Sequence, residues 1–90
     1  DPGFGFSKTT QQNYELFNNL EFFKEFQRPI IVGISRKSMI YKILNTTPEK
    51  ALNGSSVLHT ISLMKGANIL RTHDVKEALE CVKIVSQLNG

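Results

Sequence analysis

Three short polar segments hold the residues whose types could do chemistry. They read DPGFGFSK at residues 1–8, GISRKS at 33–38 and LRTHDV at 70–75. Together they contain carboxylates, hydroxyls, cations and a histidine, which are groups that bind anions and polar rings. Each segment lies where a strand would end and a helix would begin. Ligands of α/β folds bind at the carboxyl ends of parallel strands, so we expect the three segments to form one site.

The segment GISRKS places two hydroxyls and two cations at a predicted helix N-terminus. Backbone N–H groups and the helix dipole favour a carboxylate or phosphate there, and Ser38 can help to bind it. Lys37 offers a compact charge and three donors, which suit a ring carbonyl or a ring nitrogen. Arg36 has two interpretations, as an anion ligand or as a surface cation that pairs elsewhere. A capped, solvated helix start without a ligand is the alternative for the whole segment.

In LRTHDV, Arg71 and His73 alternate along the strand end, so they should point the same way, with Thr72 facing the other side. An arginine can stack on an aromatic ring and still donate to phosphate oxygens. His73 could add a donor to the same anion, or it could only fill the rim of the fold. The other histidine, His59, lies in the middle of a predicted helix and is interpreted as structural or surface.

In DPGFGFSK, the carboxylate of Asp1 can accept two parallel hydrogen bonds from a ring with adjacent N–H donors. Gly3 and Gly5 allow backbone turns that other residues avoid, so that Phe4 and Phe6 fold inward or cover a ligand. The glycine spacing fits neither a P-loop nor a dinucleotide fingerprint. No Cys and His spacing predicts a metal site, and no Ser, His and acid arrangement predicts acyl transfer.

The elements that would position these segments alternate between helical and strand patterns. Apolar residues at three- and four-residue steps predict amphipathic helices, and short continuous β-branched runs predict buried parallel strands. The predicted order is helix 11–26, strand 29–34, a helix of about two turns from residue 36, a helix from 48 to 66, strand 67–72 and a helix from 75.

Helix ends are marked by residue type. Thr47 followed by Pro48 predicts a helix start, and Gly66 predicts a stop. Asp74 with Glu77 three residues later predicts an acidic capping box for the last helix. This helix is expected to bury the apolar residues Val75, Leu79, Val82 and Val85.

The distance between the strands predicts their arrangement. Thirty-nine positions separate Ile30 from Ile69, which suits a parallel βαβ crossover. Two parallel strands cannot form a stable sheet alone, because both have an unpaired edge and they cannot cover several amphipathic helices. We therefore expect the chain to be the end of a larger α/β domain.

The composition excludes several classes. Forty per cent hydrophobic and 21% charged residues are typical of a globular chain, and the single cysteine, Cys81, rules out an internal disulfide and is interpreted as a packed thiol. No apolar run is long enough to span a membrane, and no leader is recognised, so a cytoplasmic location is expected. The net charge of +3 is spread along the chain, which argues for a small anionic partner and against nucleic acid or a membrane.

Taken in this order, the three segments resemble the last three active-site segments of dihydropteroate synthase, and the similarity covers essentially all 90 residues. The sequence SRKS at 35–38 followed by RTHD at 71–74 is specific to that family. The resemblance implies an α/β fold, as the C-terminal segment of a TIM (β/α)8 barrel: the end of strand six, and strands seven and eight with their helices. Because such a barrel takes about 250 residues, residues 1–90 would be the C-terminal part of a single pterin-binding domain whose N-terminal strands are absent.

The resemblance also implies an activity and roles. The family condenses 7,8-dihydropterin-6-ylmethyl diphosphate with p-aminobenzoate, giving 7,8-dihydropteroate and pyrophosphate for folate biosynthesis. Asp1 would bind the aminopyrimidine edge of the pterin and Lys37 its ring. Arg71 would stack on the pterin near the diphosphate, and His73 would hold phosphate. The substrate-binding set would also include Phe6 and Lys8 in the p-aminobenzoate pocket, Ser38 at the p-aminobenzoate carboxylate, and the neighbouring Ser35 and Arg36 of the same segment.

Further implications concern partners. The resemblance implies Mg²⁺ bound through the substrate diphosphate and through residues missing from this chain, a homodimer at full length, and a sulfonamide target. These 90 residues alone are expected to be inactive. Two alternatives remain open at this point: part of a corrinoid-linked pterin methyltransferase, and a non-catalytic anion-binding module.

Overall fold

The computed structural model describes residues 3–4, 9–21 and 29–88. Asp1, Phe6 and Lys8, three of the predicted substrate-binding residues, lie outside these ranges. The elements follow one another in the order α1 (Thr10–Asn18), β1 (Ile31–Val32), α2 (Ser38–Tyr41), the 3₁₀ helix η2 (Pro48–Lys50), α3 (Leu52–Met64), β2 (Ile69–Leu70) and α4 (Val75–Leu88).

The start of α1 is fixed by its own sequence. The Thr9 hydroxyl accepts a hydrogen bond from the Gln12 N–H at 3.1 Å, and Gln12 Oε1 accepts one from the Thr9 N–H at 3.0 Å. This reciprocal capping box satisfies two donors that a helix start would otherwise leave unpaired. The predicted helix 11–26 is confirmed as far as Asn18, and its residues 22–26 lie outside the described part of the chain.

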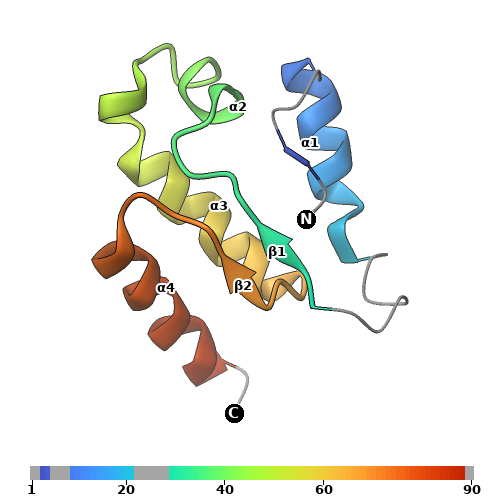
Figure 1. Ribbon diagram of the computed structural model, residues 1–90, viewed down its shortest axis with the longest axis vertical. Helices are drawn as coiled ribbons and strands as arrows, with labels where there is room; N and C mark the ends of the chain where they lie inside the picture. Colours follow the sequence, from blue (N-terminus) through green and yellow to red (C-terminus); the bar gives the residue numbers. More distant parts are fainter. Residues whose placement is uncertain (1–2, 5–8, 22–28, 89–90) are drawn as a thin grey trace.

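The two strands form a parallel pair, as the crossover length predicted. Ile31 is in register with Ile69 and Val32 with Leu70. The ladder continues at both ends, because Ile30 O accepts from the Ile69 N–H at 3.1 Å and Val32 O accepts from the Arg71 N–H at 2.9 Å. Both strands are shorter than predicted, since each has only the other as a hydrogen-bonded neighbour in the described chain. Figure 1 shows them side by side, with α3 running next to them.

The segment between β1 and α3 differs from its prediction. The helix expected from residue 36 is the four-residue α2, and the chain turns through Asn45 at φ 55°. Thr47 makes no side-chain cap, and Pro48 begins the short η2 rather than α3, which starts at Leu52. The predicted stop is confirmed: α3 ends at Met64, and Gly66 follows with φ 106°, a conformation that glycine adopts without strain.

The core lies between α1, the strands and α2. Phe4 packs against Phe17 with ring centroids 5.7 Å apart, and both are buried. Each large apolar side chain that is fully buried stabilises the fold by about 1.5–3 kcal/mol. The remaining core residues come from the same elements and from α3: Leu20, Ile30, Val32, Ile34, Met39, Ile40, Ala51 and Leu58.

The apolar side of α4 is less buried than the core. The predicted burial was wrong in three positions of four. Val85 is buried, but Val75, Leu79 and Val82 are exposed. They line an apolar groove of about 370 Å³ with Leu63 and Leu70. The sheet is too small to cover this face, which is the consequence that was expected of two strands alone.

Candidate functional site

The loops that follow β1 and β2 leave the sheet at the same end and run next to each other (Figure 1). Because the strands are parallel, GISRKS and LRTHDV meet there, as predicted. Between them lies a cavity of about 100 Å³. We call it the loop cavity, and its lining residues are Gly33, Ser35, Lys37, Arg71, Thr72 and His73.

Arg71 lies against Gly33. A methyl group at Gly33 would lie 3.2 Å from Arg71 Nη1 and 3.7 Å from its Cβ and Cδ. The missing side chain therefore lets the stem of the arginine pack onto the backbone that follows β1. Arg71 is exposed as a whole residue, while its stem packs on Gly33.

Ser35 connects the two loops. Its side chain is buried, and its Oγ accepts a hydrogen bond from the His73 N–H at 3.2 Å. The same Oγ lies 3.2 Å from His73 Nδ1 and 3.4 Å from Thr72 Oγ1. Thr72 was expected to face the other way. It lines both the loop cavity and the apolar groove beside Leu63 and Leu70, because β2 ends at Leu70 and strict strand alternation does not continue beyond it.

Arg36 is paired within the protein, and this is the second of its two interpretations. Its Nε donates to Asp74 Oδ2 at 2.9 Å, and its Nη2 donates to Asp74 Oδ1 at 2.8 Å. Its Nη1 donates to the carbonyls of Pro48 and Glu49, both at 3.0 Å. Arg36 does not line the loop cavity, so its contacts support a structural role and not the predicted substrate contact.

The pair also alters the start of α4. Both oxygens of the Asp74 carboxylate accept from Arg36, and among the described residues this carboxylate caps no helix, so the predicted acidic capping box is wrong. The Asp74 N–H instead donates to Thr72 Oγ1 at 3.0 Å. The hydrogen bond from Arg36 lowers the pKa of Asp74, and the same bond raises the pKa of Arg36. Sequence reasoning missed the pair because its members lie 38 positions apart.

Arg36 also has an unusual backbone. Its φ is 54°, in the left-handed region that residues with a side chain rarely adopt. Its N–H donates to the buried Ser55 Oγ of α3 at 2.8 Å. This turn is held from both sides, by Ser55 through the backbone and by Asp74 through the guanidinium. The result is a fixed path for the chain between Ser35 and Lys37.

Lys37 brings the first polar segment to the cavity. It stands directly before α2, and its Nζ donates to the carbonyl of the buried Phe4. The loop cavity is therefore connected to all three predicted segments, although Asp1, Phe6 and Lys8 themselves are not described. Ser38 is the first residue of α2, is half-buried and does not line the cavity.

Two other predicted roles can be compared with the structure. His59 is 2% exposed on α3, and burial lowers the pKa of its imidazole, so its interpretation as structural is confirmed. Cys81 is partly buried, and its Sγ lies 3.6 Å from the Ser56 carbonyl, which agrees with a packed thiol.

A search of the described residues for metal ligands found no group of three His, Cys, Asp or Glu side chains that could hold an ion. Within the same ranges, no helix is both long and apolar enough to cross a membrane.

The family model of pterin-binding enzymes matches residues 1–73. The chain belongs to this pterin-binding enzyme family, and its fold is part of the family's TIM barrel. Within the family it is similar to dihydropteroate synthases. It is 48% identical over 85 residues to the Escherichia coli dihydropteroate synthase, an alignment that covers 94% of this chain and 30% of the relative.

Solved structures give the same result. The 7,8-dihydropteroate synthase of Vibrio fischeri matches with a TM-score of 0.94 and 46% identity, covering 98% of this chain and 33% of that one. The Yersinia pestis enzyme with a pterin–sulfa conjugate matches with a TM-score of 0.96 and 44% identity. This match covers 99% of this chain and 35% of the Yersinia chain. The chain thus spans about a third of the length of the proteins it matches.

Proposed function

We propose that this chain supplies part of the active site of a dihydropteroate synthase, which joins 7,8-dihydropterin-6-ylmethyl diphosphate to p-aminobenzoate. The observation that carries the proposal is the loop cavity. Two loops from different strands place a lysine, an arginine and a histidine around one small space, and a buried serine connects the loops. The similarity to synthases over nearly the whole chain favours this activity over a corrinoid-linked methyltransferase or a non-catalytic module.

The residues would divide the work by their chemistry. Arg71 would stack on the pterin ring and donate to the diphosphate, and His73 would donate to the same phosphate oxygens. Lys37 would donate to the pterin ring, and the carboxylate of Asp1 would accept hydrogen bonds from the aminopyrimidine edge of the pterin. Ser35 and Ser38 stay proposed as substrate-binding residues of the same segment, as do Phe6 and Lys8 of the first.

The reaction would begin with cleavage of the bond between the pterin methylene carbon and the diphosphate oxygen. The bonding electron pair leaves with pyrophosphate, and Arg71 and His73 stabilise the negative charge that develops there. The methylene cation is captured by the amine nitrogen of p-aminobenzoate, which then loses a proton. No strong base is needed for attack, because this arylamine is neutral at pH 7.

Several features of the whole protein are part of the proposal. Mg²⁺ would bind through the substrate diphosphate and through residues outside this chain. The full-length protein would be a cytoplasmic homodimer, with small molecules as substrates and neither nucleic acid nor a membrane as partner. It would also be a sulfonamide target, which is supported by the Yersinia pestis synthase having been solved in a sulfonamide drug complex.

A chimera tests the activity. The 85 aligned residues of this chain replace the matching segment of the Escherichia coli enzyme, and the formation of dihydropteroate and pyrophosphate is measured. We expect an active chimera that loses about 100-fold or more of its activity in each of the variants Lys37→Ala, Arg71→Ala and His73→Ala. Lys83→Ala, which removes an exposed cation of α4, is the matched control and should retain activity. A folded but inactive chimera would contradict the proposal.

The isolated 90 residues give a second test. We expect no turnover, because the chain covers only about a third of each matched synthase and lacks the rest of the barrel that surrounds the substrates. The measurement is the same assay on the purified chain at high concentration. Turnover of both substrates by this chain alone would show that the loop cavity is sufficient for catalysis. The proposal that this chain supplies only part of the active site would then be wrong.

A further inference from the structure

We propose that Ser35 and Thr72 form a hydroxyl relay that holds the neutral ring of His73 in its Nε2–H tautomer, so that Nε2 presents a donor to the anion. Ser35 is then a positioning residue that acts through His73, which replaces the direct substrate contact proposed for it above. The inference rests on the proposed function for the identity of the anion, but its geometry is independent of that identity.

The relay starts at a donor whose direction is fixed. The Asp74 N–H donates to Thr72 Oγ1 at 3.0 Å, and a backbone amide cannot act as an acceptor here. Thr72 thereby uses its oxygen as an acceptor, and its own proton is available for the neighbouring Ser35 Oγ, 3.4 Å away. The position of the Asp74 backbone is in turn held by the two hydrogen bonds between its carboxylate and Arg36.

Counting lone pairs then assigns the proton of Ser35. A hydroxyl has one donor and two acceptor positions. The backbone N–H of His73 donates to one acceptor position of Ser35 Oγ at 3.2 Å, and the Thr72 hydroxyl donates to the other. Ser35 is 5% exposed, so its remaining proton has little access to solvent. With Thr72 as the donor of the bond between the two hydroxyls, the acceptor that remains within reach is His73 Nδ1, at 3.2 Å.

The assignment fixes the ring. If Nδ1 accepts from Ser35, the single proton of the neutral imidazole is on Nε2. While Thr72 donates to Ser35, the opposite tautomer would direct three donors at Ser35 Oγ and leave the serine proton without an acceptor. His73 lines the loop cavity, and Nε2 lies on the other side of the ring from Ser35, so the donor remains for a ligand. An orienting group on one imidazole nitrogen commonly sets the function of the other.

The tautomer can be measured without catalysis. The chimera described above is labelled with ¹⁵N-histidine, the spectrum is recorded at the alkaline plateau, and His73→Gln assigns the signals. Protonated and bare imidazole nitrogens have clearly different ¹⁵N frequencies. We expect a proton on Nε2 in the wild-type ring, a shift toward the two-tautomer mixture in Ser35→Ala, and a smaller shift in the same direction in Thr72→Val. Ser62→Ala, which removes another buried hydroxyl, should leave the ring unchanged.

A binding measurement supplies the functional consequence. Inorganic pyrophosphate is titrated into the same variants, and Ser35→Ala should weaken binding about fivefold, the usual size of one displaced hydrogen bond. Ser62→Ala should leave the affinity unchanged. A neutral wild-type ring protonated on Nδ1, or an unchanged tautomer in both relay variants, would overturn the proposal. If the wild-type chimera binds no pyrophosphate, the proposed function fails, and the tautomer spectrum still decides the relay.

Discussion

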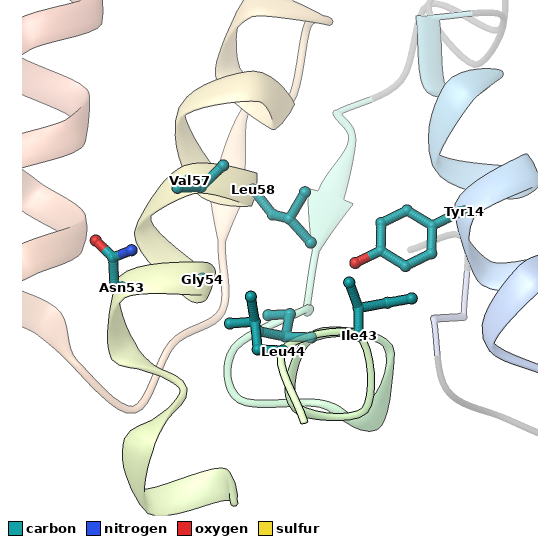
Figure 2. A pocket seen from close by; sticks show the side chains of 8 residues that line it. Tyr14, Ile43, Leu44, Asn53, Gly54, Val57 and Leu58 are labelled. Atoms are coloured by element: carbon teal, nitrogen blue, oxygen red, sulfur yellow. The ribbon is translucent and has the colours of Figure 1, made fainter. Parts of the chain in front are cut away.

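In the described part of the chain, the loop cavity and a second hollow each contain a glycine packed against a neighbouring side chain, and they are built in opposite ways. The loop cavity is lined by polar residues, and Gly33 lies against Arg71. The second hollow, of about 150 Å³, lies between α1, α2 and α3, as Figure 2 shows. It is mostly apolar, and its lining residues are Tyr14, Ile40, Ile43, Leu44, Asn53, Gly54, Val57 and Leu58.

The difference lies in what holds each hollow together. Hydrogen bonds across 37 and 38 positions of sequence hold the loop cavity, from Ser35 to the segment of Thr72 and His73 and from Arg36 to Asp74. Van der Waals packing of α2 on α3 holds the second hollow. At its rim, the Tyr14 hydroxyl donates a hydrogen bond to the Met39 carbonyl at 2.7 Å. Changes in the first should therefore alter activity, and changes in the second should alter stability.

The largest effect on this contrast is expected from the pair behind the loop cavity. In the chimera, Arg36→Lys loses the planar fork that holds both Asp74 oxygens, and the two loops lose their fixed spacing. We expect kcat/KM to fall about tenfold to 100-fold, since misplacement of a site by about 1 Å has effects of this size. Glu80→Gln, which breaks the exposed pair with Lys76, is the control and should change little.

The pairing of Arg36 with Asp74 also predicts how the stability of the fold depends on pH. The pKa of Asp74 is lowered from 3.8 by Arg36, so the charged form is favoured by folding. The contribution of the charged Asp74 carboxylate to the free energy of unfolding is complete above pH 3.8. It is lost as the pH falls from 3.8 through the lower pKa of the folded protein. Asp74→Asn should therefore lower stability at neutral pH, and the difference from wild type should shrink at the acid end of an unfolding series. A difference that stays constant with pH would contradict the charged pairing.

The variant Gly33→Ala tests whether a change in the loop cavity alters activity and leaves stability unchanged. In Gly33→Ala the new carbon would lie 3.2 Å from Arg71 Nη1, so the guanidinium must shift by a few tenths of an ångström. We expect kcat/KM to fall about tenfold, because the arginine is displaced from its ligand. The unfolding midpoint should hardly change, since the atom that yields is the flexible end of an exposed side chain. Large destabilisation with normal activity in the folded fraction would reverse our interpretation.

The variant Gly54→Ala tests whether a change in the apolar hollow alters stability and leaves activity unchanged. In Gly54→Ala the new carbon would lie 2.4 Å from Ile40 Cγ2 and 3.0 Å from Leu44 Cδ1, so α2 must move away from α3. Overpacking costs about 1–3 kcal/mol, and alanine regains up to about 1 kcal/mol of helix propensity. We expect a net loss of about 1 kcal/mol in denaturant unfolding, with activity retained at low temperature. Ser86→Ala on exposed α4 is the control.

The sequence predicted the parts of this contrast that depend on local pattern. The apolar runs at residues 29–34 and 67–72 predicted the strand pair, its parallel direction and therefore the meeting of GISRKS with LRTHDV, although the strands observed are shorter. It could not predict how Arg36 is used, because a cation at a helix start looks the same whether it binds a ligand or a carboxylate 38 positions away. It also overestimated the burial of Val75 and Leu79, since periodicity shows which face is apolar but not what covers it.

The smallest effect is expected from His59, which belongs to neither hollow. Its ring is 2% exposed, Nε2 has no hydrogen-bond partner among the described residues, and burial lowers its pKa from 6.5. The unfolded chain therefore binds the proton more readily, and stability should fall as the pH drops through 6.5 toward the lower value in the folded protein. In His59→Leu this part of the pH dependence should disappear, while Asp74 remains charged and paired in the same range. The measurement is denaturant unfolding of wild type and variant at several pH values, and parallel curves would show that His59 is not buried as a neutral group.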